Sequence, residues 1–243
     1  MKLLVYITFI GSLFAQSIDN EANERFIESL VDDINRQRNN AVIKRIDDSK
    51  ISTTIYSSHA EIIKIKALYN LNELDLALNT AKAINPLSLP PHLKTSFYLT
   101  MGDIYSVKGY YDFAFKNYID ARRTNIDSRS KKKINRRIAK LIPLNLDYDS
   151  LELLLLLEED DRNKNIILLA QSFTLVFDGS SNIAEKFQKI NLSMLDREFR
   201  VNYNFLNRNI DSGTTFSRKV GVVLPLSDRN SEISNAFLKG LLE

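Results

Sequence analysis

Apolar residues recur at helical spacing almost throughout residues 20–206, and this pattern leaves little room for a sheet. Only seven Gly and five Pro occur in 243 residues, and few segments alternate with a period of two. The pattern predicts an all-α region of antiparallel helix pairs. The expected helices lie within 22–46 (one or two capping helices), 60–71, 76–84, 98–121 (two helices), 130–141, 149–159, 164–177, 181–190 and 194–206.

One internal pattern is especially clear. The chain reads Tyr98-Leu-Thr-Met-Gly-Asp-Ile-Tyr105, then Gly109-Tyr-Tyr-Asp-Phe-Ala114, and then Tyr118 and Ala121. This order and spacing resemble the tetratricopeptide repeat, in which small residues let two antiparallel helices approach closely. A weaker copy precedes it, with Ala77 in the place of Ala114, 37 residues earlier. The usual period is about 34 residues, and the excess fits a loop from Pro86 to Pro91. The predicted fold is therefore a mainly α, tetratricopeptide-like α-solenoid.

The repeat resemblance also implies a binding surface. In tetratricopeptide arrays, the first helix of each pair lines the concave face. Asp103 and Ser106 would then point into this groove and contact a protein partner. The alternative is that both side chains are simply exposed to solvent.

The end of the chain changes character. Residues 207–217 are polar and without periodicity, as in a linker. Residues 218–226 form an apolar run that ends in Pro-Leu, and a helical pattern follows. With Ser227 and Ala236-Phe-Leu-Lys-Gly240, this segment resembles the first βα unit of type-1 periplasmic binding proteins. Residues 218–243 would be the start of such a domain, truncated, with Ser227 and Asp228 near a solute. Any other Rossmann-like α/β opening is the alternative.

The beginning of the chain resembles a secretory signal peptide. A charged start precedes the apolar stretch Leu3–Phe14, and cleavage is expected after Ala15. An uncleaved N-terminal anchor is the alternative. The chain has no Cys, so neither a disulfide nor a lipid-bearing Cys is available. The expected location is the periplasm of a Gram-negative-type bacterium.

Charge is balanced overall but locally uneven. The formal net charge is +3, which argues against a nucleic-acid partner. Nine cations crowd the stretch from Arg122 to Lys140. They would contact anionic lipid or cell-wall polymer, or form a solvated face beside a packed stripe of Ile134, Ile138 and Leu141. The acids from Glu158 to Asp161 are expected to form a solvated helix end, and their spacing reveals no basic partner. The five leucines 153–157 predict a helix buried on all sides.

The chain carries no pattern of catalytic chemistry. His59 and His92 are expected to be ordinary surface or boundary residues, and no metal-binding, phosphate-binding or nucleophile motif occurs. We therefore expect no catalytic residue, no metal and no cofactor.

A signal peptide, a helical repeat region, a linker and a binding-protein-like start follow one another in this order. The order resembles the penicillin-binding-protein activators, which stimulate a peptidoglycan synthase. It implies a non-enzymatic cell-envelope scaffold whose protein partner, such as a peptidoglycan synthase, docks in the helical groove. The alternative is the solute receptor of an ABC-type transporter for branched-chain amino acids or similar small molecules, which would bind in the missing part of the second domain.

Overall fold

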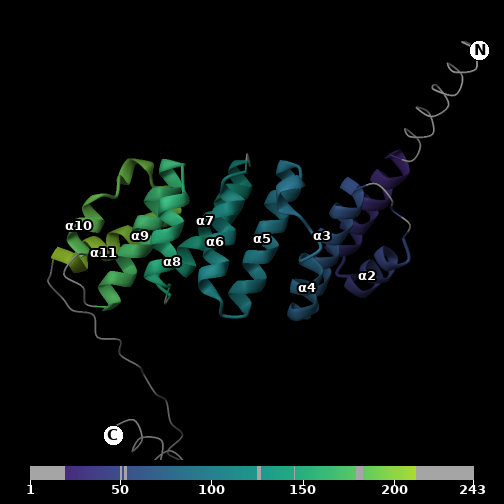
Figure 1. Ribbon diagram of the computed structural model, residues 1–243, viewed down its shortest axis with the longest axis horizontal. Helices are drawn as coiled ribbons and strands as arrows, with labels where there is room; N and C mark the ends of the chain where they lie inside the picture. The colour runs from purple at the N-terminus through teal and green to yellow at the C-terminus, as the bar shows by residue number, and fades with distance from the viewer. Residues whose placement is uncertain are drawn as a thin grey trace, which may run out of the picture.

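The protein is an elongated row of helices. A computed structural model describes residues 20–49, 51, 54–124, 127–144, 146–178 and 183–211. Figure 1 shows the helices side by side, with the first described segment at one end of the row and α11 at the other. Within the described residues all regular secondary structure is helical, which confirms the all-α prediction for this part.

Consecutive helices pack on one another. Contacts join α2 to α3, α3 to α4, α5 to α6, α6 to α7 and α8 to α9, and α3 also contacts α5. The described helices are 20–35, α2 (Asn39–Asp47), α3 (Thr54–Asn70), α4 (Leu74–Ala81), the 3-10 turn η1 (Pro86–Ser88), α5 (Pro91–Val107), α6 (Tyr111–Arg122), α7 (Ser128–Leu141), α8 (Tyr148–Leu157), α9 (Asp161–Asp178), α10 (Ile183–Gln188), η2 (Leu192–Met194), η3 (Arg197–Phe199) and α11 (Arg200–Asp211).

Three helix ends share one backbone geometry. Gln37, Asn72 and Gly109 follow segment 20–35, α3 and α5, and their φ angles are positive, at 61°, 63° and 79°. At each, the N–H donates to the carbonyl three residues back, and the next N–H donates to the carbonyl five residues before it. This is the Schellman ending, which a left-handed residue makes possible. Each turn sends the chain directly into the next helix.

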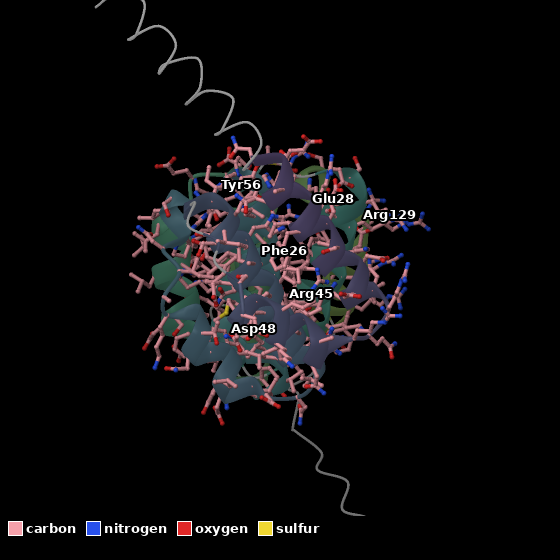
Figure 2. All side chains as sticks on the ribbon, turned by 90° about the vertical axis from the view of Figure 1, so that its right-hand side faces the viewer. Phe26, Glu28, Arg45, Asp48, Tyr56 and Arg129 are labelled. Carbon is pink, nitrogen blue, oxygen red and sulfur yellow. The ribbon has the colours of Figure 1, made fainter. Side chains whose placement is uncertain are left out.

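The apolar core is divided into three clusters in series along the row. The first joins segment 20–35, α2 and α3, the second joins α3, α4 and α5, and the third runs from α6 to α11. Tyr98 and Tyr105 of α5 pack against both the second and the third cluster. At the N-terminal end, the Arg45 guanidinium lies 5.2 Å from the centroid of the Phe26 ring (Figure 2). Each helix is therefore stabilised mainly by its neighbours in the row.

The leucine run in α8 is not buried on all sides, and that prediction was wrong. Leu154 is 7% exposed, whereas Leu153, Leu156 and Leu157 are 59%, 76% and 67% exposed. Contacts of α8 with other helices involve α9 and α6, so only part of its surface is covered. Of the exposed leucines, Leu153 and Leu157 border an apolar hollow of about 360 Å³ that Phe113 and Phe115 of α6 also line.

The ends of the chain bear on three expectations. α11 continues to Asp211, five residues into the segment expected to be a linker. The expected signal peptide (1–15) and βα unit (218–243, including Ser227 and Asp228) lie outside the described residues. In the part that the structure describes, no helix combines the length and apolar character that crossing a membrane requires.

Candidate functional site: a basic hollow beside an amide-lined hollow

A surface hollow of about 470 Å³ lies where α5, α6 and α7 meet the end of α3. We call it the basic hollow, because four of its side chains are cationic and one is a carboxylate. Both residues predicted to face a groove, Asp103 and Ser106, lie in its lining. The described residues that line it are Tyr69, Asp103, Ser106, Val107, Tyr118, Lys133, Arg136, Arg137, Lys140 and Leu141.

The cations come from one face of α7. Lys133, Arg136, Arg137 and Lys140 follow the spacing i, i+3, i+4, i+7, which places them together on a helix surface. On another face Ile134, Ile138 and Leu141 are fully or almost fully buried, as the sequence predicted. Asp127 caps the helix, since its carboxylate accepts bonds from the backbone N–H groups of residues 129 and 130. Packing of the apolar stripe therefore decides that the basic stripe faces outward.

Asp103 is fully engaged within the protein. Arg137 donates to both of its carboxylate oxygens, from Nε at 2.6 Å and from Nη2 at 3.1 Å. The Tyr118 hydroxyl donates to Oδ1 at 2.7 Å. Burial alone would lower the pKa of Arg137, but the hydrogen bond and charge of Asp103 outweigh it and raise this pKa. Asp103 thus fixes Arg137 and joins three helices at the floor of the hollow.

The absence of a side chain at Gly102 leaves space for the ring of Tyr118. A Cβ atom built at Gly102 would lie 2.5 Å from Cδ1 of Tyr118, far inside van der Waals contact. Tyr118 is 2% exposed, so its ring has little space to retreat. Burial, followed by the charge of Asp103, raises the pKa of Tyr118 well above its ordinary value. The phenol therefore stays protonated at neutral pH and continues to donate to Asp103.

The other three cations of the hollow have no acidic partner among the described residues. Lys133, Arg136 and Lys140 are exposed, and no described carboxylate lies within 4 Å of their charged groups. Other members of the same basic run behave differently. Arg122 and Lys131 pair with Asp196, and Arg123 pairs with Asp120 and with buried Glu158. Among the described residues, the basic run therefore divides into a paired part and a part without acidic partners.

This division corrects two interpretations of the sequence. Arg122 does not belong to a solvated face, because its side chain is only 3% exposed and bonds to Asp196 and Asn163. Glu158 does have a basic partner, since Arg123 Nε donates to it at 3.1 Å. Sequence spacing could not reveal this pair, because 35 residues separate its members. In contrast to the buried side chain of Arg122, Arg129 of the same basic run projects outward at the edge of the molecule (Figure 2).

A second hollow of about 730 Å³ adjoins the basic one. The two share Tyr69 and Val107, so they form one continuous surface from segment 20–35 to α7. We call the second one the amide hollow, since it is lined by Ile34, Asn35, Gln37, Asn39, Tyr69, Asn70, Asn72 and Val107. Sequence analysis missed these amides, because they come from turns and helix ends far apart in the chain.

The described residues contain no group of three or more His, Asp or Glu side chains that could hold a metal ion. His59 and His92 lie together, with ring centroids 6.3 Å apart. Burial, followed by the charge of His92, lowers the pKa of His59.

Comparisons of the chain with protein-family models, curated proteins and solved structures found no match.

Proposed function

We propose that this chain is a non-enzymatic protein-interaction scaffold of the cell envelope, which docks a partner across the basic and amide hollows. The continuous surface made by these two hollows is the observation that carries the proposal. It extends over segment 20–35, α2, α3, α5, α6 and α7, and it presents three cations that no described carboxylate neutralises. Extended surfaces assembled from successive helices are how repeat arrays bind proteins.

The proposal includes a tetratricopeptide-like organisation of the first helices. The turn residues Gln37, Asn72 and Gly109 support it, because they are 35 and 37 residues apart and share one backbone geometry. The fifth residue after each turn is fully buried: Val42, Ala77 and Ala114. A repeat period near 34 residues is close to these spacings.

The proposed setting is the periplasm, and the proposed partner is a peptidoglycan synthase. The signal-peptide-like start and the order of segments support both, through the resemblance to penicillin-binding-protein activators. The alternative solute-receptor function depends on Ser227, Asp228 and the rest of segment 218–243, which lie outside the described residues.

The test is a reconstituted glycan polymerisation assay. A penicillin-binding protein of the same organism is assayed with and without residues 16–243 of this chain. We expect the chain to raise the polymerisation rate, and the variant Lys133→Gln, Arg136→Gln, Lys140→Gln to lose most of this effect.

A matched control removes the same number of charges elsewhere. Lys44, Arg129 and Lys132 are exposed, lie outside both hollows and have no described acidic partner within 4 Å. Their change to Gln should leave the stimulation intact. No stimulation by the unmodified chain would refute the synthase as partner, and equal losses in both variants would refute the hollow as its docking site.

A further inference from the structure

The basic hollow is lined by charged side chains and the amide hollow by neutral ones, and this difference indicates which kind of ligand fits the surface. Four cations and one carboxylate line the basic hollow, and the carboxylate of Asp103 is already matched by Arg137. Lys133, Arg136 and Lys140 remain to attract negative charge. Since these side chains are exposed, pairing them with carboxylates of a ligand requires little desolvation.

The amide hollow carries no charged side chain in its lining. The side-chain amides of Asn35, Gln37 and Asn72 have no hydrogen-bond partner among the described residues. An amide group both donates and accepts, which matches the N–H and C=O groups of a peptide main chain. A simple polyanion has no donor groups, so it can accept from the N–H donors of these amides but leaves their carbonyl oxygens without a partner.

We propose that this surface binds an extended, acidic peptide segment of a partner protein. Its carboxylates lie over Lys133, Arg136 and Lys140, and its main chain continues past Tyr69 and Val107 into the amide hollow. This inference rests on the proposed function and specifies the chemistry of the partner.

The spacing of the cations suggests the spacing of the acids. Arg136 and Lys140 are four residues apart on α7, a rise of about 6 Å. Two residues of an extended peptide span about 6.6 Å, and their side chains point to the same side. A peptide with an acidic residue at every second position therefore fits the stripe.

The test uses a fluorescein-labelled dodecapeptide of alternating Glu and Ser, and its binding is measured by fluorescence anisotropy. We expect saturable binding that weakens with added salt. Replacing Lys133, Arg136 and Lys140 together by Gln should weaken binding about tenfold, since three exposed ion pairs are lost. The matched variant Lys44→Gln, Arg129→Gln, Lys132→Gln should bind within about twofold of the unmodified chain.

A second variant tests the amide hollow without damaging the fold. Gln37 and Asn72 have positive φ angles, which Gly adopts without strain. The double change Gln37→Gly, Asn72→Gly therefore removes two amides while keeping both turns. We expect it to weaken binding of the dodecapeptide about fivefold and to weaken binding of inorganic polyphosphate by a smaller factor, because polyphosphate uses only the donors of the amides.

Three outcomes would overturn the inference. The first is the absence of saturable peptide binding. The second is an unchanged affinity of the Gln37→Gly, Asn72→Gly variant, and the third is polyphosphate binding as tightly as the peptide. The last two would indicate a surface for a polyanion such as a cell-wall polymer. Stimulation of the synthase without dodecapeptide binding would refute only the acidic-peptide chemistry and leave the proposed scaffold function standing.

Discussion

At the scale of single residues, the site depends on one small residue in a crowded place. Gly102 leaves space for the Tyr118 ring, whose hydroxyl donates to Asp103, and Asp103 in turn holds Arg137. The chain of contacts runs from a helix crossing to the floor of the basic hollow. Packing at the helix crossing and the geometry of the hollow floor are therefore coupled through these four residues.

Gly102→Ala should destabilise the protein by about 1–3 kcal/mol, because the added methyl group overpacks a buried crossing. Unfolding in guanidinium chloride, followed by circular dichroism, measures the loss. Gly109→Ala is the informative comparison. No atom lies within 4 Å of a Cβ built there, so its cost of about 1–2 kcal/mol comes from the positive φ angle alone.

The two glycines should differ in their effect on the site. Gly102→Ala should weaken dodecapeptide binding as well as stability, because Tyr118 and Asp103 are displaced together. Gly109→Ala should reduce stability and leave binding nearly unchanged. Equal effects of both substitutions on binding would argue against the coupling through Tyr118.

At the scale of elements, burial within one helix is decided by its neighbours. α8 carries five consecutive leucines, yet Leu154 is almost fully buried and Leu156 is largely exposed. The sequence of α8 does not indicate which side of the helix is buried, since leucines occupy every side of its last turns. Contacts with α9 and α6 decide which side it is.

Leu154→Ala should therefore lower the free energy of unfolding by about 2–5 kcal/mol, as expected for a buried leucine. Leu156→Ala should change it by less than about 0.5 kcal/mol. Thermal denaturation of both variants beside the unmodified chain tests this contrast. A large loss at Leu156 would mean that the exposed side of α8 is covered in solution.

At the scale of the whole molecule, each helix is stabilised mainly by contacts with the helices beside it. A few polar contacts also join helices that are far apart in the sequence. The clearest one joins α6 to the turn before η3. Arg122 Nη1 and Nη2 both lie 3.2 Å from Asp196, across 74 residues of sequence. Asn163 and Asn135 also accept bonds from this guanidinium, and Phe199 lies beneath it. This node attaches the C-terminal part of the described array to its centre.

Arg122→Met should cost about 3–5 kcal/mol, because Asp196 loses a buried partner and the asparagines lose a donor. Lys131→Met is the matched control. Lys131 contacts the same carboxylate at 3.2 Å, but its side chain is 27% exposed, so we expect a cost of about 1 kcal/mol or less.

Hydrogen exchange should locate the damage caused by Arg122→Met. In a row of helices that contact mainly their neighbours, protection should fall most in residues 183–211 and least in segment 20–35. A uniform loss of protection along the chain would show that the array unfolds as one cooperative unit.

Local features of the chain could be predicted from the sequence, because helical spacing, turn glycines and close helix crossings depend on residues that are only a few positions apart. The α7 stripe of Ile134, Ile138 and Leu141, the Gly109 turn and the crossing at Gly102 all follow from such local rules. Asp103 and Ser106, which the sequence predicted to face a groove, both line the basic hollow. Periodicity therefore determined the helical class and most helix positions between residues 20 and 211.

Only the tertiary structure decided which charged side chains form ion pairs and which have no partner of opposite charge among the described residues. Arg122 and Arg136 belong to one basic run, yet Arg122 is buried against Asp196, whereas Arg136 lines a hollow and has no acidic partner in the part of the chain that the structure describes. Partners such as Arg123 and Glu158 meet across 35 residues, and pairing over such distances depends on how helices stack. The amide hollow likewise exists only because three chain segments end beside one another. Charge identity is local, but charge compensation is a property of the folded array.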